Sequence, residues 1–149
     1  MKILIEKIKE NSNITIKNKN YQVKTKTWYS LEEDNGASYI KCELSNDKVL
    51  VIIPDDNLVY IGCVIENMNY VKTSEIELEY NDKKYNKTGE GHQYIKNIEF
   101  GNINEVEGKC EFEDYESGNN IISLGILTDK NNKRADVFAE IITIEDIII

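Results

Sequence analysis

The sequence has little of what catalysis and metal binding use most. It contains one histidine, and its three cysteines, Cys42, Cys63 and Cys110, are widely spaced and form no CxxC pair. A Ser/His/Asp or Cys/His device would depend on His92 alone. This residue lies in the glycine-bearing segment TGEGHQY, which is typical of a solvated connection. Zinc sites normally include a closely spaced ligand pair, which is missing here. We expect no catalytic, cofactor-binding or metal-binding residues, and we expect reduced cysteines in a cytoplasmic protein.

Long apolar segments are also missing. No run approaches the roughly 20 residues of a membrane-spanning helix. Near the N-terminus, Glu6, Lys7 and Glu10 interrupt a stretch that could otherwise be read as a signal peptide, and no small-residue cleavage site follows. The sequence therefore predicts no direct membrane insertion.

Positive charge is scarce in the second part of the chain. The net charge is −9; residues 1–54 carry nine lysines and seven acids, whereas residues 55–149 carry nine lysines or arginines and twenty acids. An acidic surface repels phosphate backbones and anionic lipids, so we expect no nucleic-acid partner. Solubility is the simpler interpretation of this acidity.

Alternation of apolar and polar residues, by contrast, is abundant and is typical of half-buried strands. Three segments alternate in this way: YQVKTKTW (21–28), SEIELEY (74–80) and VEGKCEF (106–112). In the first segment we expect Lys24 and Lys26 on the face opposite Val23 and Thr25. The inward faces of the other two are expected to consist of Ile76, Leu78 and Tyr80, and of Val106, Cys110 and Phe112.

Other segments are apolar on both faces, which predicts central strands covered on both sides. They are VLVII (49–53), LVYIGCVI (58–65) and IISLGIL (121–127). Turn residues recur about every ten residues or a little more, the spacing of an antiparallel all-β domain. The turn segments are DNGA (34–37), SND (45–47), PDDN (54–57), ESGNN (116–120) and DKNNK (129–133). A short helix is expected within residues 1–10, and ITIEDIII (142–149) predicts a strand or a final turn.

These patterns predict a single, mainly β domain over residues 1–149, with an antiparallel sheet that is barrel-like or part of a sandwich, and with little helix. A weak internal echo suggests two related halves, residues 1–66 and 74–149. The order NKNY, SYIKCELSND, KVLVII, LVYIGCVI in the first half is followed by the order NDKKY, EGKCEFEDYESG, NIISLGI, DVFAEII in the second. A duplication explains this echo, and so does chance in a strand-rich chain.

The order of these segments also resembles the family catalogued as domain of unknown function 4178. The resemblance rests on TKTWYS, ASYIKCELSND, VLVIIPDD and VYIG, followed by EYNDKKY, GKCEFEDY and DVFAEIITIEDI. Ser38 stands where the family has an acidic residue before the aromatic Tyr39, and Ala139 or Glu140 replaces a glycine near the end. The resemblance implies a cytosolic bacterial module of no known activity, whose relatives occur beside membrane-stress or transport genes.

Trp28 is the only tryptophan, and two interpretations of it stay open. Strict alternation places it on the exposed face with Lys24 and Lys26, where Trp28, Tyr29 and Tyr39 would form an aromatic patch of the kind found at protein interfaces. A bulge or the strand end would instead turn Trp28 into the core, where a lone tryptophan usually lies. Base rates favour the core.

The function expected from these features is a non-catalytic protein-interaction module. Its partner would be another protein, held by strand addition or hydrophobic docking, and self-association through an edge strand is a further option. The alternative is a small-molecule-binding protein or an enzyme with its pocket inside a β-barrel. A deep pocket that collects His92, Asp55 or Asp56 would favour this alternative, and a filled interior would count against it.

Overall fold

The computed structural model describes residues 1–32, 37–103, 109–128 and 130–149. The predicted Asn35–Gly36 turn, Val106 and Glu107 lie outside these residues. Strands dominate, as predicted, and the short helix expected within residues 1–10 is present. The C-terminal segment, expected to be a strand or a final turn, contains both a 3-10 turn and a two-residue strand. The elements are α1 (Lys2–Lys7), β1 (Asn13–Ile16), β2 (Lys19–Gln22), β3 (Lys26–Leu31), β4 (Ser38–Glu43), β5 (Lys48–Ile53), η1 (Pro54–Asp56), β6 (Leu58–Val64), β7 (Val71–Lys72), β8 (Glu77–Tyr80), β9 (Lys83–Phe100), β10 (Cys110–Ser117), β11 (Asn120–Leu127), β12 (Lys133–Arg134), β13 (Val137–Ile142), η2 (Ile144–Asp146) and β14 (Ile147–Ile148).

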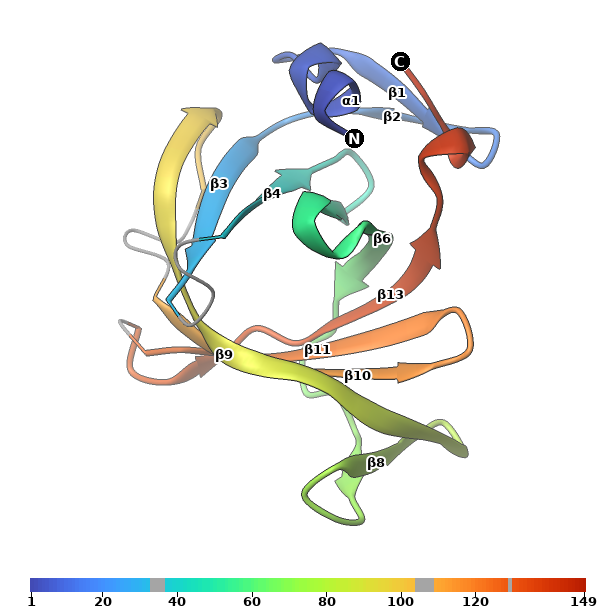
Figure 1. The fold of residues 1–149 in the computed structure, drawn as a ribbon, viewed down its shortest axis with the longest axis vertical. Helices are drawn as coiled ribbons and strands as arrows, with labels where there is room; N and C mark the ends of the chain where they lie inside the picture. Colours follow the sequence, from blue (N-terminus) through green and yellow to red (C-terminus); the bar gives the residue numbers. More distant parts are fainter. Residues whose placement is uncertain (33–36, 104–108, 129) are drawn as a thin grey trace.

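Within the described residues, eight strands close into an antiparallel barrel (Figure 1). The first four, β3 to β6, form one meander, and β9, β10, β11 and β13 form a second. The barrel closes because β3 pairs with β9 and β6 pairs with β13, both antiparallel. The prediction of a mainly β, antiparallel domain is therefore confirmed, and of the two predicted arrangements, barrel-like or sandwich, the barrel is the one present.

The two meanders run in the same strand order, and their first strands meet at one seam and their last strands at the other. This arrangement is what two related halves would produce, but a shared topology alone does not show common origin. The duplication of residues 1–66 and 74–149 stays a prediction.

The seam between β6 and β13 depends on a glycine. Gly62 faces Ala139 in the register, and a Cβ atom at Gly62 would lie 2.1 Å from the Phe138 carbonyl oxygen and 2.5 Å from the Ala139 Cα. No side chain fits at that distance, so the close approach of the two strands requires glycine at this position.

Tight turns join many neighbouring strands. Pairs of residues with positive φ form these turns, and all but one of their members are Asn or Asp, which tolerate the left-handed conformation. These pairs are Lys17–Asn18, Asn46–Asp47, Asn81–Asp82 and Asn131–Asn132. The turns predicted at 45–47 and 116–120 are confirmed, the second with Gly118 at positive φ.

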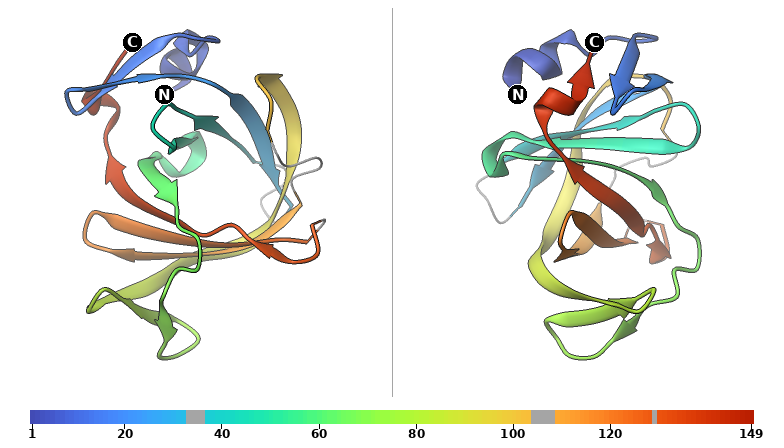
Figure 2. Two further views of the ribbon diagram at one scale, coloured as in Figure 1. Left: turned by 180° about the vertical axis from the view of Figure 1, so that it is seen from behind. Right: turned by 90° about the vertical axis from the view of Figure 1, so that its right-hand side faces the viewer.

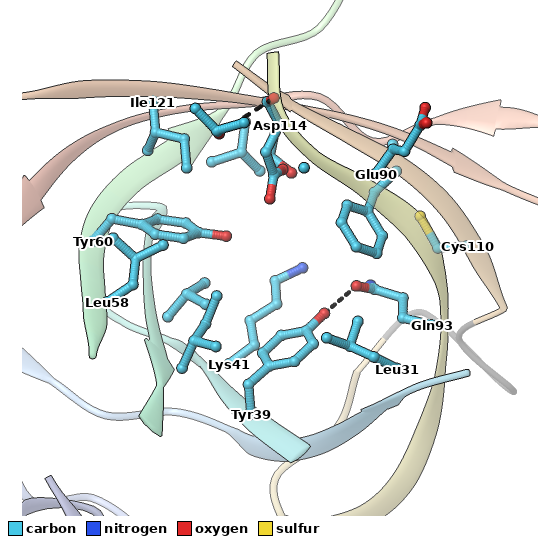
Figure 3. Close-up of a pocket in the computed structure, with 18 of the residues that line it drawn as sticks. Leu31, Tyr39, Lys41, Leu58, Tyr60, Glu90, Gln93, Cys110, Asp114 and Ile121 are labelled. Atoms are coloured by element: carbon cyan, nitrogen blue, oxygen red, sulfur yellow. Dashed lines mark hydrogen bonds between the residues drawn. The ribbon is translucent and has the colours of Figure 1, made fainter. Parts of the chain in front are cut away.

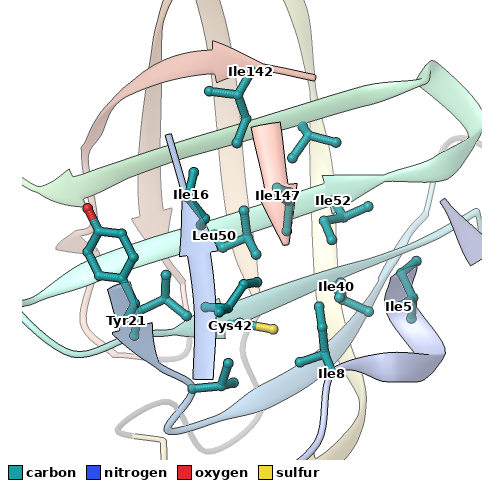
Figure 4. Close-up of a cluster of buried hydrophobic side chains, with 14 residues drawn as sticks. Ile5, Ile8, Ile16, Tyr21, Ile40, Cys42, Leu50, Ile52, Ile142 and Ile147 are labelled. Atoms are coloured by element: carbon teal, nitrogen blue, oxygen red, sulfur yellow. The ribbon is translucent and has the colours of Figure 1, made fainter. Parts of the chain in front are cut away.

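Two apolar clusters cover the outside of the barrel. The first lies between the outer face of β4, β5 and β6 and a layer made of α1 and the small sheet β14–β1–β2, close to both chain termini (Figures 1, 2 and 4). The second lies under the β7–β8 segment at the opposite end (Figure 1), and it includes Leu78 of β8 and Ile122 and Leu124 of β11. Strand β5 is buried on both faces, as its doubly apolar pattern predicts, because Leu50 and Ile52 pack in the first cluster and Val51 faces the interior of the barrel.

Two predictions about strand faces are wrong. Lys26, expected on an exposed face, is only 2% exposed, because it lies under α1 and its charge is fully engaged there. Ile76, expected beside the buried Leu78, is 67% exposed. It precedes the first residue of β8, so the alternation of the strand does not yet apply to it.

Candidate functional site

The barrel encloses a cavity of about 520 Å³. Its walls come from every strand of the barrel, through the residues that alternation turns inward. Apolar side chains make up much of the wall, and they include Leu31, Val49, Val51, Ile53, Leu58, Phe112, Ile121, Leu127 and Val137. The interior is therefore not filled, which is the arrangement that the pocket alternative required.

Strand β10 carries the most polar part of the wall. Cys110, Phe112, Asp114 and Glu116 line the cavity, whereas the intervening Glu111 is exposed on the outside. The inward orientation predicted for Cys110 and Phe112 is confirmed. The same alternation continues for two more acidic positions, so that two carboxyl groups lie on the inner face.

Asp114 is the most unusual of these groups. Its carboxyl group points into the cavity (Figure 3), and its Oδ1 atom is fully buried without a hydrogen-bond partner among the described residues. Burial raises the pKa of Asp114 to about 6, a hydrogen bond from Ser123 opposes this rise, and the charges of Glu116 and Asp56 add to it. The side chain is thus poised to change charge near neutral pH.

Other polar groups point toward the same space from the facing wall. Figure 3 shows the Tyr60 hydroxyl and the Lys41 ammonium directed into the cavity, while the Tyr39 hydroxyl donates a hydrogen bond to Gln93. Burial raises the pKa values of Tyr39 and Tyr60 well above that of free tyrosine, so both hydroxyls stay protonated and can donate hydrogen bonds. The cavity therefore offers donors and a carboxylate acceptor across a mostly apolar space.

Acidic residues mark an opening of the cavity. Asp56, on η1, is exposed and also belongs to the lining, so it lies where the cavity meets solvent. Glu116, near the end of β10, is half-buried and acts electrostatically on Asp114 together with Asp56. Glu90 belongs to the lining too, but its carboxylate points away from the cavity and pairs with Lys87.

The aromatic patch proposed from the sequence does not form one surface. Tyr29 and Tyr39 are buried inside the barrel, where their rings stack with centroids 5.2 Å apart. Trp28 points to the other side of β3, is half-buried against the outer cluster and donates from Nε1 to Glu99 at 3.4 Å. Alternation explains the separation, because Trp28 and Tyr29 are neighbours on one strand. Contact of Trp28 with a partner stays a prediction.

His92 belongs to the outer surface. It lies within the long strand β9 rather than in a connection, which corrects the sequence-based interpretation, and its Nε2 lies 3.2 Å from Glu111 Oε1. Both residues line a second hollow of about 440 Å³ on the outside of the barrel, together with Tyr70, Lys72 and Arg134. His92 does not line the barrel cavity, whereas Asp56 does.

The cysteines are spread over different faces. Cys42 is buried in the outer cluster, where desolvation raises its pKa to about 12, and Cys110 lines the cavity. No group of three His, Cys, Asp or Glu among residues 1–32, 37–103, 109–128 and 130–149 is placed to hold a metal ion. The helices in those same ranges are all too short or too polar to cross a membrane.

Searches of protein-family models, curated proteins and solved structures find no match to this chain. The resemblance to the domain of unknown function 4178 therefore stays a prediction.

Proposed function

We propose that this protein binds a small molecule inside its β-barrel. The observation that carries the proposal is the unfilled interior of about 520 Å³, lined by apolar side chains and by a few convergent polar groups. Ligand sites in proteins have this size, roughly 300–1,000 Å³, and this mixture of apolar wall and polar anchors.

The cavity arises from small residues on one wall of the barrel. Gly89, Ser123, Gly125 and Ala135 belong to the lining and fill little of the space that eight strands enclose. A Cβ at Gly125 would lie 2.7 Å from the Ala135 carbonyl oxygen, so backbone packing already requires a glycine there. The small side chains leave room for a ligand beside Asp114.

A neutral aromatic dye tests the proposal. N-phenyl-1-naphthylamine becomes fluorescent in an apolar environment, and we expect saturable binding of one dye per chain. Val137→Phe, which adds a ring to the cavity wall, should weaken binding at least tenfold, whereas Val71→Phe, on the exposed strand β7, should leave it unchanged. Absence of saturable binding, or equal binding by Val137→Phe, would contradict the proposal.

Protein binding, the expectation from the sequence, is the second candidate. The observation that favours it is the β7–β8 edge, where β7 ends the larger sheet and the apolar Val71 and Ile76 are exposed. An exposed edge of this kind accepts a further strand from a partner.

The edge can be tested without disturbing the barrel. A partner captured from the native lysate and then purified should bind the wild-type chain, and Val71→Asp with Ile76→Asp should weaken that complex at least tenfold. The Val137→Phe variant should bind it normally. Equal binding by the edge variant would remove this candidate.

A further inference from the structure

We infer that the ligand of the barrel is an apolar or aromatic amine, and that its ammonium group pairs with the carboxylate of Asp114. The inference rests on the proposed function and adds the chemical class of the ligand. A second outcome, an acidic ligand held by Lys41, is distinguished by the test below.

The first observation is the missing hydrogen-bond partner of Asp114. Ser123 is the hydrogen-bonding side chain beside this carboxyl group, and Oδ1 is buried without a partner among the described residues. An ionised carboxylate can only accept hydrogen bonds, and leaving a buried acceptor unsatisfied costs about 1–3 kcal/mol. A donor that enters the cavity would remove this cost, and a charged N–H donor would do so best.

The second observation is the charge at the approach to Asp114. The two charged neighbours that raise its pKa, Asp56 and Glu116, are both acidic, and Asp56 lies at the opening. They would attract a cation toward the cavity and repel an anion. Their repulsion of the Asp114 carboxylate would also fall when an ammonium group lies between them.

Lys41 places a positive charge in the same cavity, which would favour an anionic ligand instead. Figure 3 shows its ammonium group entering from the wall that faces Asp114, beside Tyr39 and Tyr60. The apolar side chains between the two walls give the body of a ligand a place to lie. An amine oriented toward Asp114 would keep its positive charge on the acidic side and its apolar body in the remaining space.

The inference predicts a defined dependence of affinity on pH. The groups that face Asp114 are Glu116 and Cys110 on its own strand, Asp56 on η1, Tyr60 on β6, and Tyr39 and Lys41 on β4. Only the ionised carboxylate pairs with an ammonium group. Because the pKa of Asp114 is about 6 without ligand, protonation between pH 7 and pH 5 should weaken amine binding about tenfold.

Three naphthalene compounds that differ only in their head group test the inference by isothermal titration calorimetry. They are 1-naphthylmethylamine, which is cationic at pH 5–7.5, 1-naphthylmethanol, which is neutral, and the acetate, that is, the anion of 1-naphthaleneacetic acid. For the wild-type chain at pH 7.5 we expect the amine to bind at least tenfold more tightly than the alcohol, and the acetate to bind most weakly.

Matched variants assign the effect to Asp114. Asp114→Asn should bind the amine and the alcohol with similar affinity and lose the pH dependence of amine binding. Glu111→Gln, which removes a charge from the outer face of the same strand, should behave as the wild type, and so should His92→Gln, which removes the imidazole that lies 3.2 Å from Glu111 on that outer face. The change with pH in the affinity of the wild-type chain for the amine tests the inference without any variant.

Each result has one meaning. If the alcohol binds and the amine binds no more tightly, the inference fails while small-molecule binding stands. If the acetate binds most tightly, Lys41 is the anchor and the inference also fails. If none of the three compounds binds, the proposed function fails with it.

Discussion

Two charged side chains lie on opposite sides of the barrel wall, and their surroundings differ. On the outside, Lys26 is buried beneath α1, and its ammonium group donates to the carbonyl oxygens of Ile5 at 2.8 Å and Ile8 at 3.2 Å and pairs with Glu99 at 2.8 Å. On the inside, Asp114 keeps one buried oxygen without a partner among the described residues. A buried charge with all its partners fixes structure, whereas one that lacks a partner is suited to binding.

The same difference applies to the apolar residues around the two charges. The outer cluster is closed by α1 and the small sheet, which contribute Ile5 and Ile147 to it (Figure 4). The inner face leaves the cavity open between its walls. The same substitution should therefore lower the free energy of unfolding by different amounts on the two faces.

The largest effect is expected from a matched pair of isoleucines. Ile52 faces the outer cluster and Ile121 lines the cavity, and both are essentially fully buried. Ile52→Ala should lower the free energy of unfolding by about 4 kcal/mol. Ile121→Ala should lower it by about 2 kcal/mol, because its side chain borders open space and has fewer packing partners to lose. Urea unfolding measures both, and equal losses would contradict the difference between the faces.

Removal of the Lys26 charge should cost somewhat less. Lys26→Met keeps the length of the side chain but leaves two carbonyl oxygens at the end of α1 and the Glu99 carboxylate without their donor, which should lower stability by about 3 kcal/mol. Amide hydrogen exchange in residues 2–8 should also accelerate, because Lys26 holds the end of α1. Lys24→Met, on the exposed neighbour, is the control and should have little effect. If Lys26→Met is as stable as the wild type, the contacts of the Lys26 ammonium group make no net contribution to the free energy of unfolding.

Removal of the Asp114 charge should have the opposite sign. The pKa of Asp114 is raised in the folded state from 3.8 to about 6, so folding favours the protonated form. Stability contributed by this group is present below about pH 4 and is lost as the pH rises to about 6. The shift corresponds to at most about 3 kcal/mol. Because a buried amide also has a desolvation cost, Asp114→Asn should stabilise the protein by about 2 kcal/mol at pH 7.5.

Two comparisons sharpen this prediction. The gain from Asp114→Asn should disappear at pH 4, where the wild-type carboxyl group is already protonated, and Glu111→Gln should give no gain at either pH. Urea midpoints at the two pH values measure the effect. A destabilising Asp114→Asn at pH 7.5 would mean that its carboxylate has partners that this account does not include.

The sequence predicts the strands and many of the turns because those depend on neighbouring residues. The doubly apolar segment at 49–53 becomes β5, and the turn at 45–47 forms with Asn46 and Asp47 at positive φ. Closure of the barrel could not be read in this way, since alternation says which face a residue occupies but not which strand lies beside it. Asparagines supply many of the left-handed turn positions, among them Asn18, Asn81 and Asn131.

The site was harder to predict for a related reason. The segment 111–116 contains acids at both odd and even positions, so it resembles a solvated charged strand. Only the structure separates Glu111, on the outside, from Asp114, on the inside. The sequence did hold one indication: if the inward alternation predicted for Cys110 and Phe112 is continued by two residues, Asp114 also faces inward. The burial of Lys26 depends on α1 and on Glu99, which are distant in the sequence, so no local pattern reveals it.

The position of a bound amine tests the central claim most directly. Methyl-resolved NMR of the wild-type chain with 1-naphthylmethylamine should give nuclear Overhauser effects from the naphthalene protons to Val51, Ile121 and Val137, which line the barrel cavity. Effects confined to Leu124 and Ile126, which line the outer hollow, would place the ligand outside the barrel and contradict the account.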